Sequence, residues 1–118
     1  MMQRTMLKSK LHRAIVTDAD LHYEGSITID ENLMDAADLL PYEKVEIYDV
    51  SNGERFSTYV IKGARESGVI CLNGAAARKV SRGDIIIIAS FVTVEDELTR
   101  GWTPTCVLLD GQNRIKNK

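Results

Sequence analysis

Short apolar stretches separated by turn-forming residues recur along the whole chain. Residues 26–29 and 45–50 alternate apolar and polar positions, which predicts half-buried strands. Asn52-Gly53 is a strong signal for a tight hairpin turn between two strands. Strands are expected at residues 11–17, 26–29, 45–50, 55–61, 69–72, 85–94 and 107–109.

One helix interrupts this series of strands. Asp30 has the character of an N-cap, and an apolar stripe along residues 31–40 (Leu33, Met34, Ala37 and Leu40) predicts an amphipathic helix that ends before Pro41. Residues 73–78 are expected to form a turn that leads into a short helical segment, and the polar tail 113–118 is expected to fray. Many short strands with one or two short helices predict a mainly β protein, in the form of a compact barrel.

Composition narrows the class of protein. The 118 residues carry a net charge of −2, which suits a single soluble domain and argues against nucleic acid or anionic membrane as a partner. The apolar run 85–89 is far too short to span a membrane, and the N-terminal residues lack the hydrophobic segment of a secretory signal. Cys71 and Cys106 are expected to be buried in a reducing cytosol. His12 and His22 have no metal-ligand spacing, so no metal site is expected.

Gly25-Ser26 is the dipeptide with the most unusual potential chemistry. A serine hydroxyl lies close to the preceding carbonyl and can attack it, which converts the amide to an ester. Elimination and hydrolysis of that ester would cut the chain and leave a ketone at the new N-terminus. Gly25 suits this reaction because, without a Cβ, its backbone can adopt unusual geometry. Gly-Ser is common in loops, so the interpretation depends on the surrounding residues.

Those surroundings carry a resemblance that runs from about residue 4 to residue 110. The chain resembles the aspartate 1-decarboxylase family, whose pyruvoyl-dependent members make β-alanine for pantothenate synthesis. The matching segments keep the family's order and spacing, and they are residues 5–7, 10–13, 19–26, 52–59, 73–77 and 83–93.

The resemblance implies a proenzyme of one domain, residues 1–118, that cleaves itself between Gly25 and Ser26 into a β chain, 1–25, and an α chain, 26–118. Ser26 would become a pyruvoyl group, which forms a Schiff base with L-aspartate and serves as the electron sink for loss of CO2. It also implies a double-psi β-barrel and a cytoplasmic homotetramer with sites between subunits. A helper protein for maturation is compatible with it.

Three residues of the segment 55–59 are expected in the site. A retained carboxylate calls for a bidentate cation, and we assign Arg55 to the side-chain carboxylate of the substrate, although a solvated strand cation is the alternative. By resemblance, Tyr59 is the proton donor to the carbanion carbon, and Thr58 stabilises the oxyanion of self-cleavage and later contacts substrate. Strand alternation should place Thr58 and Tyr59 on opposite faces, so a bulge or a subunit boundary is needed to unite them.

The remaining candidates come from two other segments. By resemblance, Gly74, Ala75 and Ala76 contact substrate, and their small size would let backbone N–H groups approach an anion. Asn73 would add an amide near the pyruvoyl imine or near the leaving carboxylate, and Lys10 would add a cation.

Two other classes of function compete with the enzyme. In a small binding or scaffold module, Gly25-Ser26 would be merely a turn. In a hydrolase, Ser26 would be the nucleophile, but the sequence offers neither histidine an obvious acidic partner.

Overall fold

The computed structural model describes residues 1–116. The chain forms an eight-stranded mixed sheet in the order β2-β6-β3-β5-β4-β7-β1-β8, accompanied by one α-helix and two short 3-10 helices. The elements are β1 (Gln3–Ile15), β2 (Asp18–Asp20), β3 (Ser26–Asp30), α1 (Glu31–Ala37), β4 (Lys44–Asp49), β5 (Arg55–Gly63), β6 (Ile70–Asn73), η1 (Gly74–Lys79), β7 (Ile85–Glu95), η2 (Asp96–Leu98) and β8 (Thr105–Leu108).

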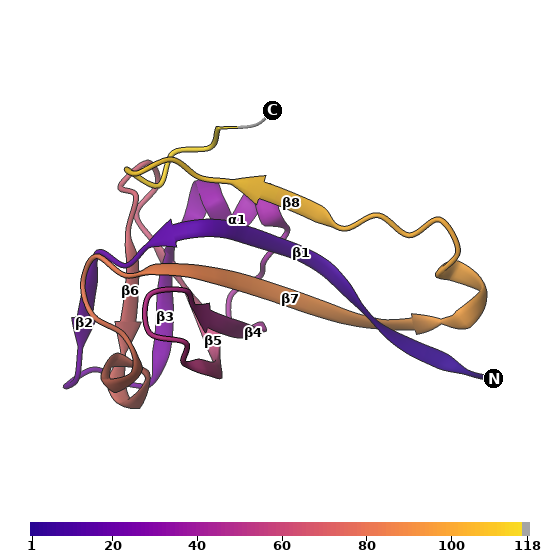
Figure 1. Cartoon of the computed structure of the whole chain (residues 1–118), viewed down its shortest axis with the longest axis horizontal. Helices are drawn as coiled ribbons and strands as arrows, with labels where there is room; N and C mark the ends of the chain where they lie inside the picture. Colours follow the sequence, from indigo (N-terminus) through magenta and orange to yellow (C-terminus); the bar gives the residue numbers. More distant parts are fainter. Residues whose placement is uncertain (117–118) are drawn as a thin grey trace.

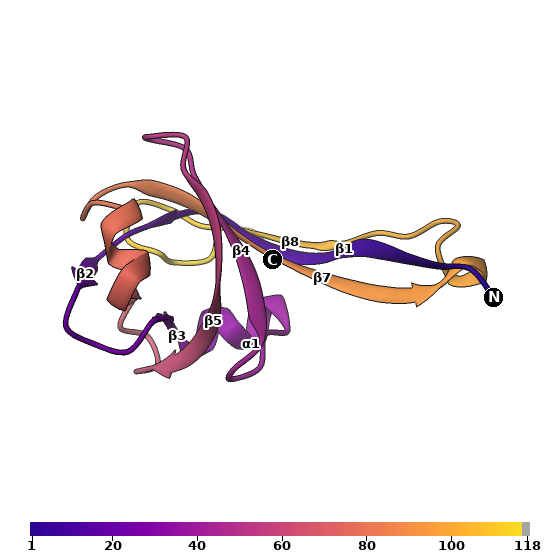
Figure 2. The same ribbon diagram turned by 90° about the horizontal axis from the view of Figure 1, so that it is seen from below.

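The longest elements, β1 and β7, pair antiparallel and extend away from the rest of the molecule as an arm that carries the N-terminus (Figure 1, Figure 2). β2, β3, β6 and η1 lie at the opposite end. The prediction of a first strand at residues 11–17 was too short, because pairing of residues 3–11 with β7 extends β1 to Gln3. These cross-strand partners lie 77 to 92 positions away in the sequence, so a local pattern does not reveal them.

The mainly β prediction is confirmed, and both parallel and antiparallel pairs occur. β3 pairs parallel with β5 and antiparallel with β6, whereas β1 pairs parallel with β8. β2 and β8 are the two ends of the strand order, and within residues 1–116 no pairing joins them to close a barrel.

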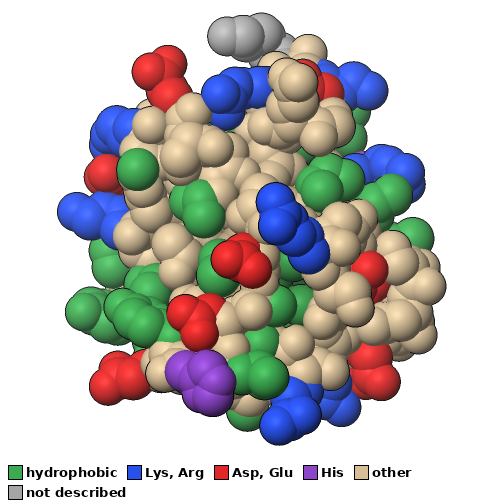
Figure 3. All heavy atoms as spheres, turned by 90° about the vertical axis from the view of Figure 1, so that its left-hand side faces the viewer, with side chains coloured by type: hydrophobic (Ala, Val, Ile, Leu, Met, Phe, Trp, Pro, Cys, Tyr) green, Lys and Arg blue, Asp and Glu red, His purple; other side chains and the backbone are tan. Residues whose placement is uncertain are grey.

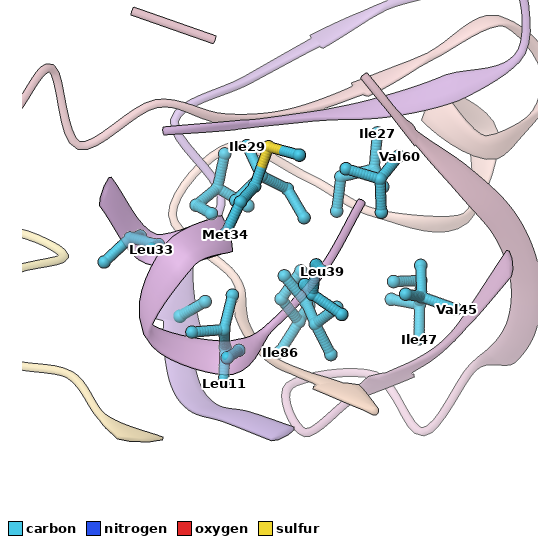
Figure 4. Close-up of a cluster of buried hydrophobic side chains, with 14 of the residues drawn as sticks. Leu11, Ile27, Ile29, Leu33, Met34, Leu39, Val45, Ile47, Val60 and Ile86 are labelled. Atoms are coloured by element: carbon cyan, nitrogen blue, oxygen red, sulfur yellow. The ribbon is translucent and has the colours of Figure 1, made fainter. Parts of the chain in front are cut away.

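The hydrophobic core lies where α1 packs against the inner face of the sheet (Figure 4). Asp30 caps α1 as predicted, since its carboxylate accepts a hydrogen bond from the Asn32 N–H at 2.8 Å. The helix ends earlier than predicted, because Asp38 adopts a left-handed conformation with φ of 55°. Leu40 therefore leaves the apolar stripe and is 66% exposed, while Leu33 and Met34 are buried.

The end of the chain is more ordered than its polarity predicts. Asn113 is buried, donates to the carbonyls of Ile15 and Gly68, and accepts from the Ile15 N–H. The prediction of fraying from residue 113 is therefore wrong for Asn113, and positions 117–118 lie outside the described residues. The prediction of two buried cysteines is wrong for Cys106, which is exposed, and holds only in part for Cys71, which is half-buried.

The predicted hairpin joins β4 to β5, with Gly53 at a φ of 81°. Asp49 ends β4 and is buried, and its carboxylate accepts hydrogen bonds from the N–H groups of Ser51 at 2.8 Å and Asn52 at 3.2 Å. Burial, with the carboxyl of Asp84 nearby, raises the pKa of Asp49 to about 6.

On the face that carries β2 and η1, acidic and basic side chains are interspersed rather than segregated by sign (Figure 3). Across residues 1–116, no helix has both the length and the apolar character needed to traverse a bilayer.

Candidate active site

A hollow of about 400 Å³ lies along β5, next to the beginning of β3. Because Ile27 pairs with Val60, the register places Ser26, the first residue of β3, beside Tyr59. The preceding residues of β5 have no neighbour in β3, so this edge of β5 is open. Five of the predicted site residues line the hollow, and they are Gly25, Thr58, Tyr59, Ala75 and Ala76.

Ser26 lies directly behind this hollow and is 1% exposed. Its hydroxyl donates to the carbonyl of Glu24 at 3.2 Å and accepts a hydrogen bond from Asn73 Nδ2 at 2.9 Å. Ser26 and Asn73 are directly opposed in the antiparallel pairing of β3 and β6. The structure thus joins two of the predicted residues by a buried hydrogen bond that sequence spacing alone could not reveal.

Gly74 holds the segment that precedes Ser26 in close contact. Its φ is +65°, and a Cβ at this position would lie 2.7 Å from the Gly25 nitrogen and 2.8 Å from the Gly25 Cα. Such distances are far below a van der Waals contact, so only glycine fits. Gly25 differs, because it is not in the left-handed region and a Cβ there would meet nothing within 4 Å. The expectation that Gly25 supplies unusual backbone geometry is therefore not met, and the constrained glycine is Gly74.

Thr58 and Tyr59 reach the same hollow without a bulge between them. The pairing of β4 with β5 is regular from Lys44 opposite Tyr59 to Tyr48 opposite Arg55. Alternation therefore puts the two side chains on opposite faces, as predicted. Both contact the hollow because it lies at the open edge of the strand, which is accessible from either face. The Tyr59 ring also lies 6.2 Å from the ring of Tyr42, centroid to centroid.

Arg55 and Lys10 are not among the residues that line the hollow. The Arg55 guanidinium is exposed and stacks 4.1 Å above the centre of the Tyr48 ring, on the same face of β5 as Tyr59. Lys10 is half-buried on β1, and β4 and β7 separate β1 from β5 in the sheet. Three strand spacings of about 4.8 Å, measured along the sheet, therefore separate the Lys10 backbone from β5 within one chain.

Sequence reasoning missed three residues that line the hollow, namely Phe56, Ser57 and Lys79. Lys79 is the one charged side chain among the described residues that line it, and its ammonium lies 3.2 Å from a carboxylate oxygen of Glu54. The signal that could have identified Lys79 is helical spacing, since it lies three positions after Ala76 in η1, and residues three apart share a face of a 3-10 helix.

The site therefore combines a buried serine hydroxyl, an amide donor, a phenol and an ammonium around small residues. This set suits an anionic or polar ligand and proton transfer by Tyr59. Neither His12 nor His22 lines the hollow, so the lining offers no imidazole to activate Ser26 as in a hydrolase.

The chain is similar to known proteins along nearly its whole length. The family model described as aspartate decarboxylase matches residues 2–116. The chain is 74% identical over 116 residues to the aspartate 1-decarboxylase of Syntrophus aciditrophicus, which covers 98% of this chain and 100% of the relative. It is 58% identical over 116 residues to the aspartate 1-decarboxylase of Paraburkholderia phymatum, which covers 98% of this chain and 91% of the relative. By this similarity, the chain belongs to the aspartate decarboxylase family.

Proposed function

We propose that this chain is a self-processing lyase that converts L-aspartate to β-alanine and CO2, and so supplies pantothenate biosynthesis. Family membership supports the reaction, because the relatives named above are aspartate 1-decarboxylases. The observation that carries the proposal is the buried Ser26 hydroxyl, which is hydrogen-bonded to Asn73 immediately behind a hollow lined by Gly25 and Tyr59.

Maturation would begin with attack of Ser26 Oγ on the carbonyl carbon of Gly25. The C–N bond breaks, the hydroxyl proton passes to the released amine, and an ester joins the two residues. Loss of the Ser26 Cα proton and cleavage of the Cβ–Oγ bond then leave a carboxylate on Gly25. Water replaces the amine, which departs as ammonia, and leaves a ketone on residue 26. Thr58 lines the same hollow as Gly25, which supports its role as a donor to the oxyanion. The products would be chains 1–25 and 26–118.

The residues around Ser26 fit the pyruvoyl group that this reaction creates. The position is buried, the adjacent Gly25 opens onto the hollow, and the Asn73 amide points at the hydroxyl that would be consumed. When present, the pyruvoyl group supplies a carbonyl that condenses with the substrate amine and accepts the electron pair released with CO2.

The surrounding residues would orient aspartate and handle its proton. Tyr59 lies beside residue 26 in the strand register and would return a proton to the carbon that lost CO2. Gly74, Ala75 and Ala76 would let backbone N–H groups approach a carboxylate, because they present almost no side-chain bulk. Arg55 would bind the retained side-chain carboxylate with its planar pair of donors.

We further propose a homotetramer of double-psi β-barrels in the cytoplasm, with sites between subunits. Within one chain, β4 and β7 lie between β1 and β5 and Lys10 does not line the hollow, which supports its delivery to the site by a neighbouring subunit. The parallel β2–β6, β3–β5 and β1–β8 pairs, which occur beside antiparallel pairs in one sheet, support a barrel with crossed connections.

Mass analysis of the denatured protein tests the proposal directly. We expect two fragments, 1–25 and 26–118, and the larger should have the mass expected for a pyruvoyl group at residue 26. Borohydride in the presence of aspartate should reduce the Schiff base and trap the substrate on this fragment. Ser26→Ala should fold, remain intact and lack decarboxylase activity. A wild-type chain that stays whole on warming and does not release CO2 from aspartate would favour a binding or scaffold module instead.

A further inference from the structure

Two polar side chains on β6 face two hydroxyls on β3. The antiparallel register pairs Ser26 with Asn73 and Thr28 with Cys71. Side chains two positions apart in a strand share a face, and directly opposed residues are in contact distance across the pair. The four side chains therefore form one polar cluster at the start of β3, immediately behind the Gly25-Ser26 bond.

Within this cluster the Asn73 amide uses both of its ends. Its Nδ2 donates to Ser26 Oγ at 2.9 Å and to Thr28 Oγ1 at 3.0 Å, while its Oδ1 accepts from Cys71 Sγ at 3.3 Å. Asn73 is buried, with 3% of its surface exposed, so each unmet hydrogen bond would carry a desolvation cost.

Two groups bias the orientation of this amide, the Cys71 thiol and the Ser26 hydroxyl. A hydroxyl both donates and accepts, so Ser26 and Thr28 could satisfy either end of the amide. The Cys71 S–H is a weak donor, and its contact with Oδ1 at 3.3 Å favours this oxygen over Nδ2 on the Cys71 side. The Ser26 hydroxyl agrees with this choice, since its own hydrogen points to the Glu24 carbonyl.

The environment keeps the thiol in its donor form. Burial raises the pKa of Cys71, and the carboxylates of Asp18 and Asp20 raise it further. A thiolate would lose the hydrogen that Asn73 Oδ1 accepts.

We propose that Cys71 is a positioning residue for self-cleavage: its S–H group fixes the Asn73 amide so that Nδ2 holds the Ser26 hydroxyl against the Gly25-Ser26 bond. The inference rests on the proposed self-processing. Without the thiol, the amide can turn over, and its Oδ1 would then compete with Glu24 for the Ser26 hydrogen. The serine hydroxyl would spend less time in one orientation, and attack would slow.

The experiment follows first-order cleavage of unprocessed chains, made by cell-free synthesis in the cold and then warmed, by intact mass. Cys71→Ala and Cys71→Val should cleave about fivefold more slowly, the effect of one hydrogen bond. Cys71→Ser restores a donor and should cleave within about twofold of the wild-type rate. Cys106→Ala, which alters the cysteine on β8, is the matched control and should be unchanged.

Rescue by serine separates positioning from mere packing, because valine fills the space better than serine does. Cleavage of Cys71→Ala and Cys71→Val at the wild-type rate, or of Cys71→Ser as slowly as these two, would overturn the inference. Failure of the wild-type chain to cleave would instead overturn the proposed function. Thermal unfolding of each variant shows whether it is folded, and the alanine and valine variants give two independent chances of a folded chain without the donor.

Discussion

Replacing Gly74 by alanine perturbs the cleavage segment through a backbone contact. The added Cβ would lie 2.7 Å from the Gly25 nitrogen and 2.8 Å from the Tyr23 carbonyl oxygen. Ordinary contacts of this kind are about 3.5 Å or longer, so the segment before Ser26 must move by roughly 0.8 Å. The left-handed φ of +65° adds strain of about 1–2 kcal/mol to alanine at this position.

A displacement of about 1 Å at a reacting group can cost up to about a hundredfold in rate. We therefore expect Gly74→Ala to cleave ten- to a hundredfold more slowly than wild type when fragment 26–118 is followed by intact mass. Gly53→Ala is the matched control: its φ is +81°, but an added Cβ meets nothing within 4 Å. In urea, Gly53→Ala should lose only the stability that its left-handed φ costs, whereas Gly74→Ala should lose more because of the added contact, and only Gly74→Ala should lose cleavage. Equal cleavage rates in the two variants would refute the idea that close packing on Gly25 positions the bond.

Three further predictions concern Tyr59, Arg55 and Asp49. Tyr59→Phe should still be processed but should lose about 10²–10⁴-fold in kcat for CO2 release, and normal turnover in a fully processed sample would exclude a proton-donor role. Arg55→Ala should raise KM for aspartate more than Arg55→Lys does, whereas unchanged affinity in both variants would reject the carboxylate assignment. Asp49 has its pKa raised from 3.8 to about 6, so the folded chain holds the extra proton between these values and the free energy of unfolding falls as pH rises through that window. In wild type, this change in the free energy of unfolding should amount to at most about 3 kcal/mol in urea titrations from pH 4 to 7, and Asp49→Asn should abolish it. A pH dependence equal to that of wild type in this variant would assign the effect to other groups.

Local signals predicted the elements whose causes are local. Asp30 caps α1 through its own carboxylate, and Asn52-Gly53 turns β4 into β5 without help from distant residues. Leu40 was misassigned because Asp38 ends the helix by adopting a left-handed conformation, which the apolar pattern does not encode. The local sequence predicts a frayed tail at Asn113, yet this residue is buried and donates hydrogen bonds to the distant carbonyls of Ile15 and Gly68.

The candidate site likewise contains residues that the sequence could name and contacts that only the structure reveals. Ser26 and Tyr59 could be named from the resemblance, but their adjacency depends on the parallel register of β3 with β5. The contact of Gly74 with Gly25 joins segments about 50 residues apart. The hydrogen bond from Cys71 to Asn73 joins neighbours on one strand, but it depends on how the two side chains are oriented. Neither follows from residue type, whereas the position of Lys79 on the same face of η1 as Ala76 does follow from the three-residue period of a 3-10 helix.

The proposed cleavage would also change what the Asn73 amide can bind. Ser26 Oγ leaves residue 26 with the Gly25 carboxylate, so one N–H of Nδ2 loses its acceptor at 2.9 Å, while the other keeps Thr28 Oγ1. A buried donor left without a partner costs about 1–3 kcal/mol. Any oxygen acceptor that enters next to residue 26, whether a carbonyl or a carboxylate, would recover part of that energy. Maturation would in this way convert a hydrogen bond that stabilises the precursor into affinity at the site, and Cys71 would hold the amide ready for both partners.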